Sequence, residues 1–301
     1  MKLAAVETFV VGNPPPGFGG RYFVFVKLTT DDGIVGYGEA YAASFSPQVV
    51  ASQLVDVAEQ HLIGRSPFGI EQFWRSAYSR GFTGRPDVSL QGTMSALEMA
   101  CWDIIGKALD QPVYQLLGGR IHERLRSYTY LYPEPNDATD VYVDPDLGAE
   151  RAVAAVDRGF TAVKFDPAGP YTVMGGHQPS LERIALSVEF LAKIRDAVGD
   201  RADLLFGTHG QFTSGGALRL ARQLEPFDPL WFEEPVPPDN IPEMAKVASQ
   251  TTIPIAAGER LTTKAEFARL LEAKAVSIVQ LNLARSGGIL EGKKIASIAE
   301  A

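Results

Sequence analysis

The chain has 301 residues, of which 46% are hydrophobic and 21% are charged, an ordinary composition for a globular protein of one or two domains. Its net charge of −8 argues against a general affinity for nucleic acid, and no stretch approaches the ~20 apolar residues of a membrane span. A single cysteine, Cys101, and a start without the apolar run of a signal peptide predict a cytoplasmic protein without disulfides.

Residues 1–125 contain strand patterns followed by helical patterns, an order typical of an α+β domain. We predict strands at 3–11, 22–29 and 34–39. Asp32-Gly33, between the second and third of these, is a strong hairpin signal. Residues 46–118 are mainly helical, and 95–109 carries its apolar residues at helical spacing.

From residue 126 onward, strand and helix patterns alternate, which predicts parallel strands. The predicted strands are 126–132, 161–166, 203–208, 229–234, 253–258 and 276–282. The predicted helices include 147–158, 181–198, 215–224, 241–249 and 263–273. Eight units of this length would take ~235 residues, close to the ~250 of a typical (β/α)8 barrel. We therefore predict that 126–301 is a TIM-type (β/α)8 barrel truncated after about six βα units.

The rival architecture is an open doubly wound sheet, which six strands would also fill. Its dinucleotide-binding version is weakened because no Gly-x-Gly-x-x-Gly follows the first strand of this region. In the barrel, the carboxyl ends of the strands form the active site, so polar residues at those ends should converge. The change of pattern near residue 126 also predicts that the N-terminal domain caps the barrel, with loops 12–22 and 80–86 over the strand ends.

Two of these strand ends carry glutamates. Glu233 and Glu259 follow successive strands, and a pair of carboxylates facing one mouth suits a hard cation such as Mg²⁺. The alternative for each is a helix-capping or solvated acidic group. Two such ends in succession favour the metal hypothesis.

Lys164 lies inside an apolar strand, and we interpret it as a base, a Schiff-base lysine, or one half of an ion pair with Asp166 or a neighbouring acid. His209 follows the strand 203–208. A neutral imidazole there would ligate a metal, a protonated one would donate a proton, and a solvated loop histidine is the plain alternative.

A longer signature resembles the enolase superfamily, in its mandelate racemase/muconate lactonizing enzyme subgroup, and most of all the sugar-acid dehydratases. The motifs that carry it are 95–107 (SALEMACWDIIGK), 112–119 (PVYQLLGG), the hairpin 31–40, Glu233-Glu234-Pro235, Gly258-Glu259-Arg260 and Ser286-Gly287-Gly288. The resemblance spans essentially the whole chain. It implies an N-terminal α+β capping domain, 1–125, and a catalytic barrel domain, 126–301.

The resemblance also implies a reaction. Mg²⁺ on acidic strand ends holds the substrate carboxylate and stabilises the enediolate formed when a base removes the α-proton. A general acid then assists loss of the β-hydroxyl of a sugar acid. Carried onto this chain, the catalytic candidates are Lys164, Asp166 and His209, and the metal candidates are Glu233 and Glu259. The substrate-binding candidates are Arg260, Arg21 and Arg285.

Three positions depart from the family pattern. Gly207 stands where the first metal ligand is usually an aspartate, and Asp166 replaces the second lysine of Lys-x-Lys. Asn282 replaces the usual acid of the sixth strand, and 169–179 looks like an insertion. The alternatives to a Mg²⁺-dependent dehydratase are a racemase or epimerase using the same chemistry, and a truncated, non-catalytic relative. We also expect the protein to form a homo-oligomer.

Overall fold

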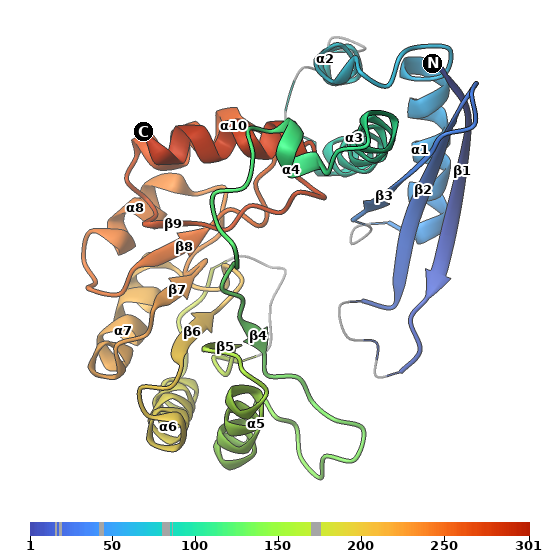
Figure 1. The fold of residues 1–301 in the computed structure, drawn as a ribbon. Coiled ribbons are helices and arrows are strands. Elements are labelled where there is room, and N and C mark those ends of the chain that lie inside the picture. Colours follow the sequence, from blue (N-terminus) through green and yellow to red (C-terminus); the bar gives the residue numbers. More distant parts are fainter. Residues whose placement is uncertain (16, 18–19, 42–44, 80–84, 86, 170–175) are drawn as a thin grey trace. The chain divides into compact units, whose positions relative to one another are not determined.

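The computed structural model describes residues 1–15, 17, 20–41, 45–79, 85, 87–169 and 176–301 (Figure 1). Packing divides them into two compact units. The N-terminal unit contains Met1–Glu123 together with the later segments Gly258–Ala268 and Leu281–Ala301. The sheet unit contains Arg124–Ala257 and Arg269–Gln280. None of the helices in the described ranges combines the length and apolar character needed to cross a membrane.

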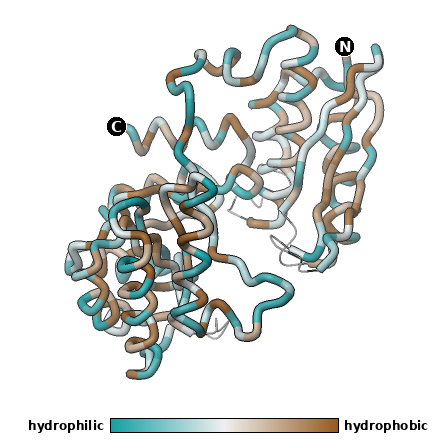
Figure 2. The backbone as a smooth tube through the Cα atoms, turned by 60° about the horizontal axis from the view of Figure 1, so that its bottom comes forward, coloured by the Kyte–Doolittle hydropathy of each residue, from teal (hydrophilic) through white to brown (hydrophobic). Residues whose placement is uncertain are grey.

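A three-stranded antiparallel sheet in the order β1-β2-β3 builds the N-terminal unit. Its strands are β1 (Leu3–Gly12), β2 (Tyr22–Thr30) and β3 (Val35–Ala40). The predicted hairpin is present, because β2 and β3 pair from Thr29↔Val35 outward and the Thr30 hydroxyl accepts from the Ile34 amide. Alternate residues of β2 are buried, and Figure 2 shows the hydrophobic stretches along this sheet.

Four helices accompany this sheet in sequence. They are α1 (Pro47–His61), α2 (Ile70–Tyr78), α3 (Val88–Leu109) and α4 (Val113–Leu116). Helix α3 packs on the sheet and contributes Met94, Leu97 and Ile104 to the core. Cys101, also on α3, is buried and free, as the sequence predicted.

Helix α10 (Ile289–Glu300) belongs to the same unit and is anchored by a carboxylate of α3. Glu98 accepts hydrogen bonds from the backbone amides of Ile289 (2.8 Å) and Leu290 (2.9 Å), and from the indole of Trp102 (2.7 Å). These amides belong to the first turn of α10, which has no partner within its own helix for them. Burial of the Glu98 carboxyl raises its pKa to about 7.

The sheet unit is built on six parallel strands that follow one another in sequence order. They are β4 (Thr129–Tyr130), β5 (Ala162–Phe165), β6 (Asp203–Gly207), β7 (Trp231–Glu233), β8 (Ile255–Ala257) and β9 (Ile278–Val279). A doubly wound sheet reverses its strand order partway, so the sequential order excludes that rival. It is the order of consecutive units in a (β/α)8 barrel, and the predicted fold class is confirmed.

Helices alternate with these strands (Figure 1). They are α5 (Pro145–Asp157), α6 (Leu181–Val198), α7 (Ser214–Leu224), α8 (Ile241–Ala248) and α9 (Lys264–Glu272), with a 3-10 turn, Glu225–Phe227, after α7. From α5 to α8 each helix packs against the next one along the chain. The backbone of one strand thus feeds a helix that returns the chain to the start of the next strand, as βα units require.

Side chains on the inner face of this sheet form layers. Ala162, Leu205, Trp231 and Ala256 make one apolar layer, with Ile278 packed against it. Because side chains on a strand alternate between faces, residues two positions further on return to the same face. That next layer contains Lys164, Gly207, Glu233 and Gln280, at the carboxyl ends of their strands. The fold therefore places a polar layer directly above an apolar floor.

Candidate active site

A buried ion pair occupies the centre of the polar layer. The Nζ atom of Lys164 on β5 lies 2.8 Å from Oε2 of Glu233 on β7, and both side chains are 6% exposed. The ammonium also lies 5.6 Å from the ring centroid of Tyr130. Of the partners considered from the sequence, the neighbouring acid Glu233 holds the lysine ammonium. An ion pair so removed from water needs further hydrogen bonds to offset its desolvation.

Glu233 obtains those hydrogen bonds from two further donors. The indole Nε1 of Trp231 donates to Oε2 at 3.1 Å, and the amide Nε2 of Gln280 donates to the same oxygen at 3.2 Å. Gln280 also lies 3.3 Å from the hydroxyl of Tyr128. Three donors on one oxygen hold the carboxylate in a single orientation, which is how outer residues position a functional carboxylate.

Asp166 and His209 form a second pair beside the first. Oδ2 of Asp166 lies 3.2 Å from Nδ1 of His209 and also accepts from the hydroxyl of Tyr130. The carboxylate is buried, with 2% of its side chain exposed, whereas the histidine side chain is 35% exposed. A carboxylate on Nδ1 fixes the orientation of the imidazole. The pair can therefore orient an exposed proton donor.

The backbone at these strand ends is held in an uncommon conformation. His209 and Glu234 have φ angles of 47° and 43°, in the left-handed region that non-glycine residues rarely adopt. The Thr208 hydroxyl donates to the carbonyl of Glu234 at 2.9 Å, and the amide of Gly210 donates to the same carbonyl at 2.6 Å. These bonds join the ends of β6 and β7. Such local strain is concentrated at functional sites, where the surrounding structure enforces it.

A narrow space, too small for a water molecule, lies between Lys164, Gly207, His209, Glu233 and Glu234. The predicted residues Lys164, Asp166, His209 and Glu233 are thus packed together. In the described part of the chain, no three His, Cys, Asp or Glu side chains are gathered as a metal-binding group. Asp166 and Glu233 nevertheless offer carboxylate oxygens on one face, and Mg²⁺ typically uses one or two protein carboxylates and completes its shell with waters. The donor chemistry of these two carboxylates therefore fits Mg²⁺.

The other four predicted site residues belong to the N-terminal unit. Glu259 and Arg260 follow β8 along the chain and are half-buried. Arg285 is buried, donates to the carbonyl of Glu259 at 3.2 Å, and stacks 3.6 Å above the ring of Tyr41. Arg21 is exposed and lines a hollow of about 580 Å³ with residues of β2 and β3. The roles assigned to these four from the sequence remain predictions.

Several predicted features fall partly outside the described residues. They are the loop 12–22 at residues 16 and 18–19, the loop 80–86 at 80–84 and 86, and the insertion 169–179 at 170–175. The predicted position of the two loops over the strand ends remains a prediction.

Three residues of the cluster were not identified from the sequence. Tyr130, Trp231 and Gln280 contact the acids directly, but none stands in a recognisable catalytic motif. Strand alternation carried one usable signal, because Tyr130 and Gln280 are polar residues at or just beyond the ends of β4 and β9. Trp231 gave no such signal, because a tryptophan in an apolar strand is expected to be a core residue.

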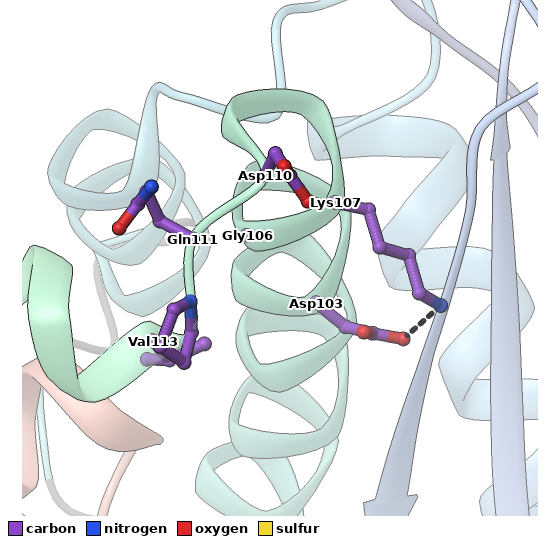
Figure 3. A pocket seen from close by; sticks show the side chains of 7 residues that line it. Asp103, Gly106, Lys107, Asp110, Gln111 and Val113 are labelled. Carbon is purple, nitrogen blue, oxygen red and sulfur yellow. Dashed lines mark hydrogen bonds and ion pairs between the residues drawn. The ribbon is translucent and has the colours of Figure 1, made fainter.

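A separate hollow of about 410 Å³ lies at the end of α3 (Figure 3). Its charged groups serve local structure. Lys107 pairs with Asp103 at 2.8 Å and donates to the carbonyl of Val35, while Asp103 accepts from the amide of Tyr37. These contacts tie α3 to β3, so we assign the hollow no chemistry.

Comparisons with known proteins define the class. Residues 17–118 match the mandelate racemase/muconate lactonizing enzyme N-terminal domain, and residues 148–301 match the enolase C-terminal domain-like family. The chain therefore belongs to the mandelate racemase/muconate lactonizing enzyme family of the enolase superfamily, as its sequence motifs indicated.

Particular relatives point to one branch of that family. The chain is 35% identical to the D-xylonate dehydratase of Haloferax volcanii, over 99% of this chain and 70% of that protein. It is also 35% identical to the D-gluconate/D-galactonate dehydratase of Picrophilus torridus, over 99% of this chain and 74% of that protein. Among solved structures, a mandelate racemase/muconate lactonizing enzyme-like protein from Roseovarius sp. TM1035 is 56% identical. The TM-score is 0.97, and the match covers 100% of this chain and 76% of that one. Together these findings support a sugar-acid dehydratase or related enolase-superfamily activity.

Proposed function

We propose that this protein is a Mg²⁺-dependent sugar-acid dehydratase, a hydro-lyase that removes the proton α to a carboxylate and eliminates the β-hydroxyl. The observation that carries the proposal is the pairing of Lys164–Glu233 with Asp166–His209 at one end of the parallel sheet. A base candidate on β5, Lys164, thus lies beside an acid candidate, His209, that follows the end of the neighbouring strand β6. Dehydration needs both, because the α-carbon loses a proton and the departing hydroxyl must gain one to leave as water.

Each residue receives a role in this proposal. Lys164 accepts the α-proton as a neutral amine, and its stem rests among buried groups that exclude water. His209, oriented by Asp166, donates a proton to the departing hydroxyl. Glu233 and Glu259 hold the metal, and Arg260, Arg21 and Arg285 bind the substrate. Bound Mg²⁺ would fix the substrate carboxylate and offset the negative charge that develops there.

The roles of Lys164 and His209 can be separated by exchange with solvent. A panel of sugar acids, including D-xylonate and D-gluconate, is incubated in D₂O with Mg²⁺ and followed by NMR. Lys164→Ala should lose both α-proton exchange and dehydration. His209→Asn should still exchange the α-proton but form little 2-keto-3-deoxy acid. Exchange that persists in Lys164→Ala would overturn the assignment of the base.

The product distinguishes the proposed reaction from the racemase or epimerase alternative. A dehydratase converts the sugar acid to a 2-keto-3-deoxy acid, whereas an epimerase returns an acid with an inverted α-centre. Asp166 in place of a second lysine favours dehydration, because a two-base racemase needs a second base for the α-carbon. An inverted acid as the main product would replace the dehydratase proposal with the epimerase one.

A further inference from the structure

Gly207 is shaped by its neighbour Asp166. A Cβ atom added to Gly207 would lie 2.3 Å from Oδ1 of Asp166 and 3.2 Å from its Cγ. The same atom would lie 3.1 Å from Cε of Lys164. Gly207 is not among the residues with positive φ, so its backbone does not require glycine. The carboxylate of Asp166 is what leaves no room for a side chain at position 207.

Register explains how this carboxylate arrives there. β5 and β6 pair in parallel as Lys164↔Leu205 and Phe165↔Phe206, so the next residues along are Asp166 and Gly207. Gly207 in turn pairs with Glu233 on β7. Asp166, Gly207 and Glu233 are therefore neighbours in register across three adjacent strands. The carboxylate of Asp166 occupies the space where the side chain of residue 207 would begin.

The two oxygens of Asp166 face different surroundings. Oδ2 is used by His209 and Tyr130. Oδ1 is the oxygen beside Gly207. One carboxylate can thus orient the histidine through Oδ2 and present Oδ1 to a cation, since ligating carboxylates are commonly hydrogen-bonded through their second oxygen.

We propose that Asp166 supplies from β5 the metal-binding carboxylate that β6 lacks, and that Gly207 provides the room for it. The aspartate that is missing at Gly207 and the aspartate that replaces a lysine at Asp166 are then one change, in which the carboxylate has moved from β6 to β5. This inference rests on the proposed function, because it assigns a ligand to the same divalent cation. It adds metal binding to the role of Asp166 in orienting His209, whose Nδ1 lies 3.2 Å from Oδ2.

Binding of Mn²⁺, measured by electron paramagnetic resonance on the full chain without substrate, tests the ligand. Asp166→Asn keeps the size of the side chain and should weaken Mn²⁺ binding roughly ten-fold or more. His209→Asn is the matched control, because it removes one of the two partners of Oδ2 and should leave Mn²⁺ affinity within about two-fold. Equal affinity of wild type and Asp166→Asn overturns the inference and leaves the proposed function standing. A wild-type chain that binds no Mn²⁺ overturns both.

A carboxylate returned to β6 provides the converse test. Gly207→Asp alone should clash with Asp166, whereas Asp166→Ala/Gly207→Asp should recover Mn²⁺ affinity to within roughly ten-fold of wild type. Thermal unfolding tests whether Asp166 excludes a side chain at position 207, in variants that introduce no new charge. Gly207→Ala should lower the Tm of the wild type and leave that of Asp166→Ala nearly unchanged. A Gly207→Ala effect of equal size in both backgrounds would show that Asp166 is not what excludes a side chain at 207.

Discussion

Nζ of Lys164 and Oε2 of Glu233 are 2.8 Å apart, and both side chains are almost completely removed from water. The pair joins β5 to β7 across the strand between them, where Gly207 has no side chain to intervene. The base and the metal ligand proposed for the reaction therefore hold each other in place. The ion pair therefore serves both the proposed reaction and the stability of the sheet.

Breaking this pair on one side should destabilise the protein more than removing it whole. Lys164→Met leaves the Glu233 charge buried without its ammonium, and should lower the free energy of unfolding by about 3 kcal/mol. Lys164→Met/Glu233→Gln removes both charges and should recover most of that loss. Urea unfolding of the wild type, Lys164→Met, Glu233→Gln and the double variant measures the coupling energy between the two side chains. Additive single effects would contradict a paired arrangement.

Loss of the His209 imidazole should affect turnover and spare metal binding. His209→Asn should reduce dehydration by roughly 10²–10⁴-fold, the usual contribution of a general acid. Mg²⁺ affinity, measured by calorimetry, should stay unchanged because carboxylates rather than imidazole bind this cation. Unchanged turnover would remove His209 from the mechanism, and lost Mg²⁺ affinity would make it a ligand instead.

The Thr208 hydroxyl should matter through the backbone that it holds. Thr208→Val keeps the shape but leaves the Glu234 carbonyl without this donor, and should cost about 1 kcal/mol of stability. Turnover should also fall, because His209 and Glu234 lose a bond that fixes their positive φ angles. Thr208→Ser keeps the hydroxyl and is the control for both readouts. If Thr208→Val matches Thr208→Ser in stability and turnover, the strand-end bond has no such role.

Stability should depend on pH through Glu98. Burial raises the pKa of this carboxyl to about 7, above its ordinary value near 4.5, so the folded state holds the proton more tightly. The stabilisation is complete below pH 4.5 and is lost as pH rises through 7, by on the order of 3 kcal/mol. Glu98→Gln stays neutral throughout and should not show this fall.

The measurement is the free energy of unfolding from pH 5 to pH 8, taken as wild type minus Glu98→Gln. The difference cancels groups that titrate alike in both proteins. It should decline from pH 5 to about pH 7, where only the folded state holds the proton, and level off above pH 7. Parallel curves would mean that Glu98 does not titrate there in the folded protein.

Regular periodicity predicted most elements well and missed those defined by hydrogen bonding. The helix expected at 181–198 is α6, Leu181–Val198. The strand expected at 126–132 contracts to Thr129–Tyr130, because Arg126 contacts residue 161 through its side chain and lies outside the strand. Helix α3 begins at Val88, inside the region 46–118 that was expected to be mainly helical but before the apolar spacing seen at 95–109, where Asp87 caps the amides of Ser89 and Leu90. The spacing of apolar residues identifies the buried face of a helix or strand. It does not identify helix-capping residues or how many residues of a strand form hydrogen bonds with the next strand.

The site was foreseeable in its residues and not in its pairings. Strand ends pointed to Lys164, His209 and Glu233, because parallel strands bring such ends to one edge. The contact of Lys164 with Glu233 depends on the register across two strand pairs, which no local pattern fixes. Gly207 and Asp166 each looked like a lost function, since their coupling exists only where β5 and β6 lie side by side.

Formation of a 2-keto-3-deoxy acid from a sugar acid tests the proposed dehydratase activity most directly. The purified chain is incubated with a panel of sugar acids, with Mg²⁺ or with a chelator, and the keto acid is quantified. A Mg²⁺-dependent dehydratase should form product from at least one sugar acid with Mg²⁺ and none with chelator, and Lys164→Ala should form none. Equal product with chelator, or from Lys164→Ala, would contradict the proposal, as would the absence of product from every acid in the panel.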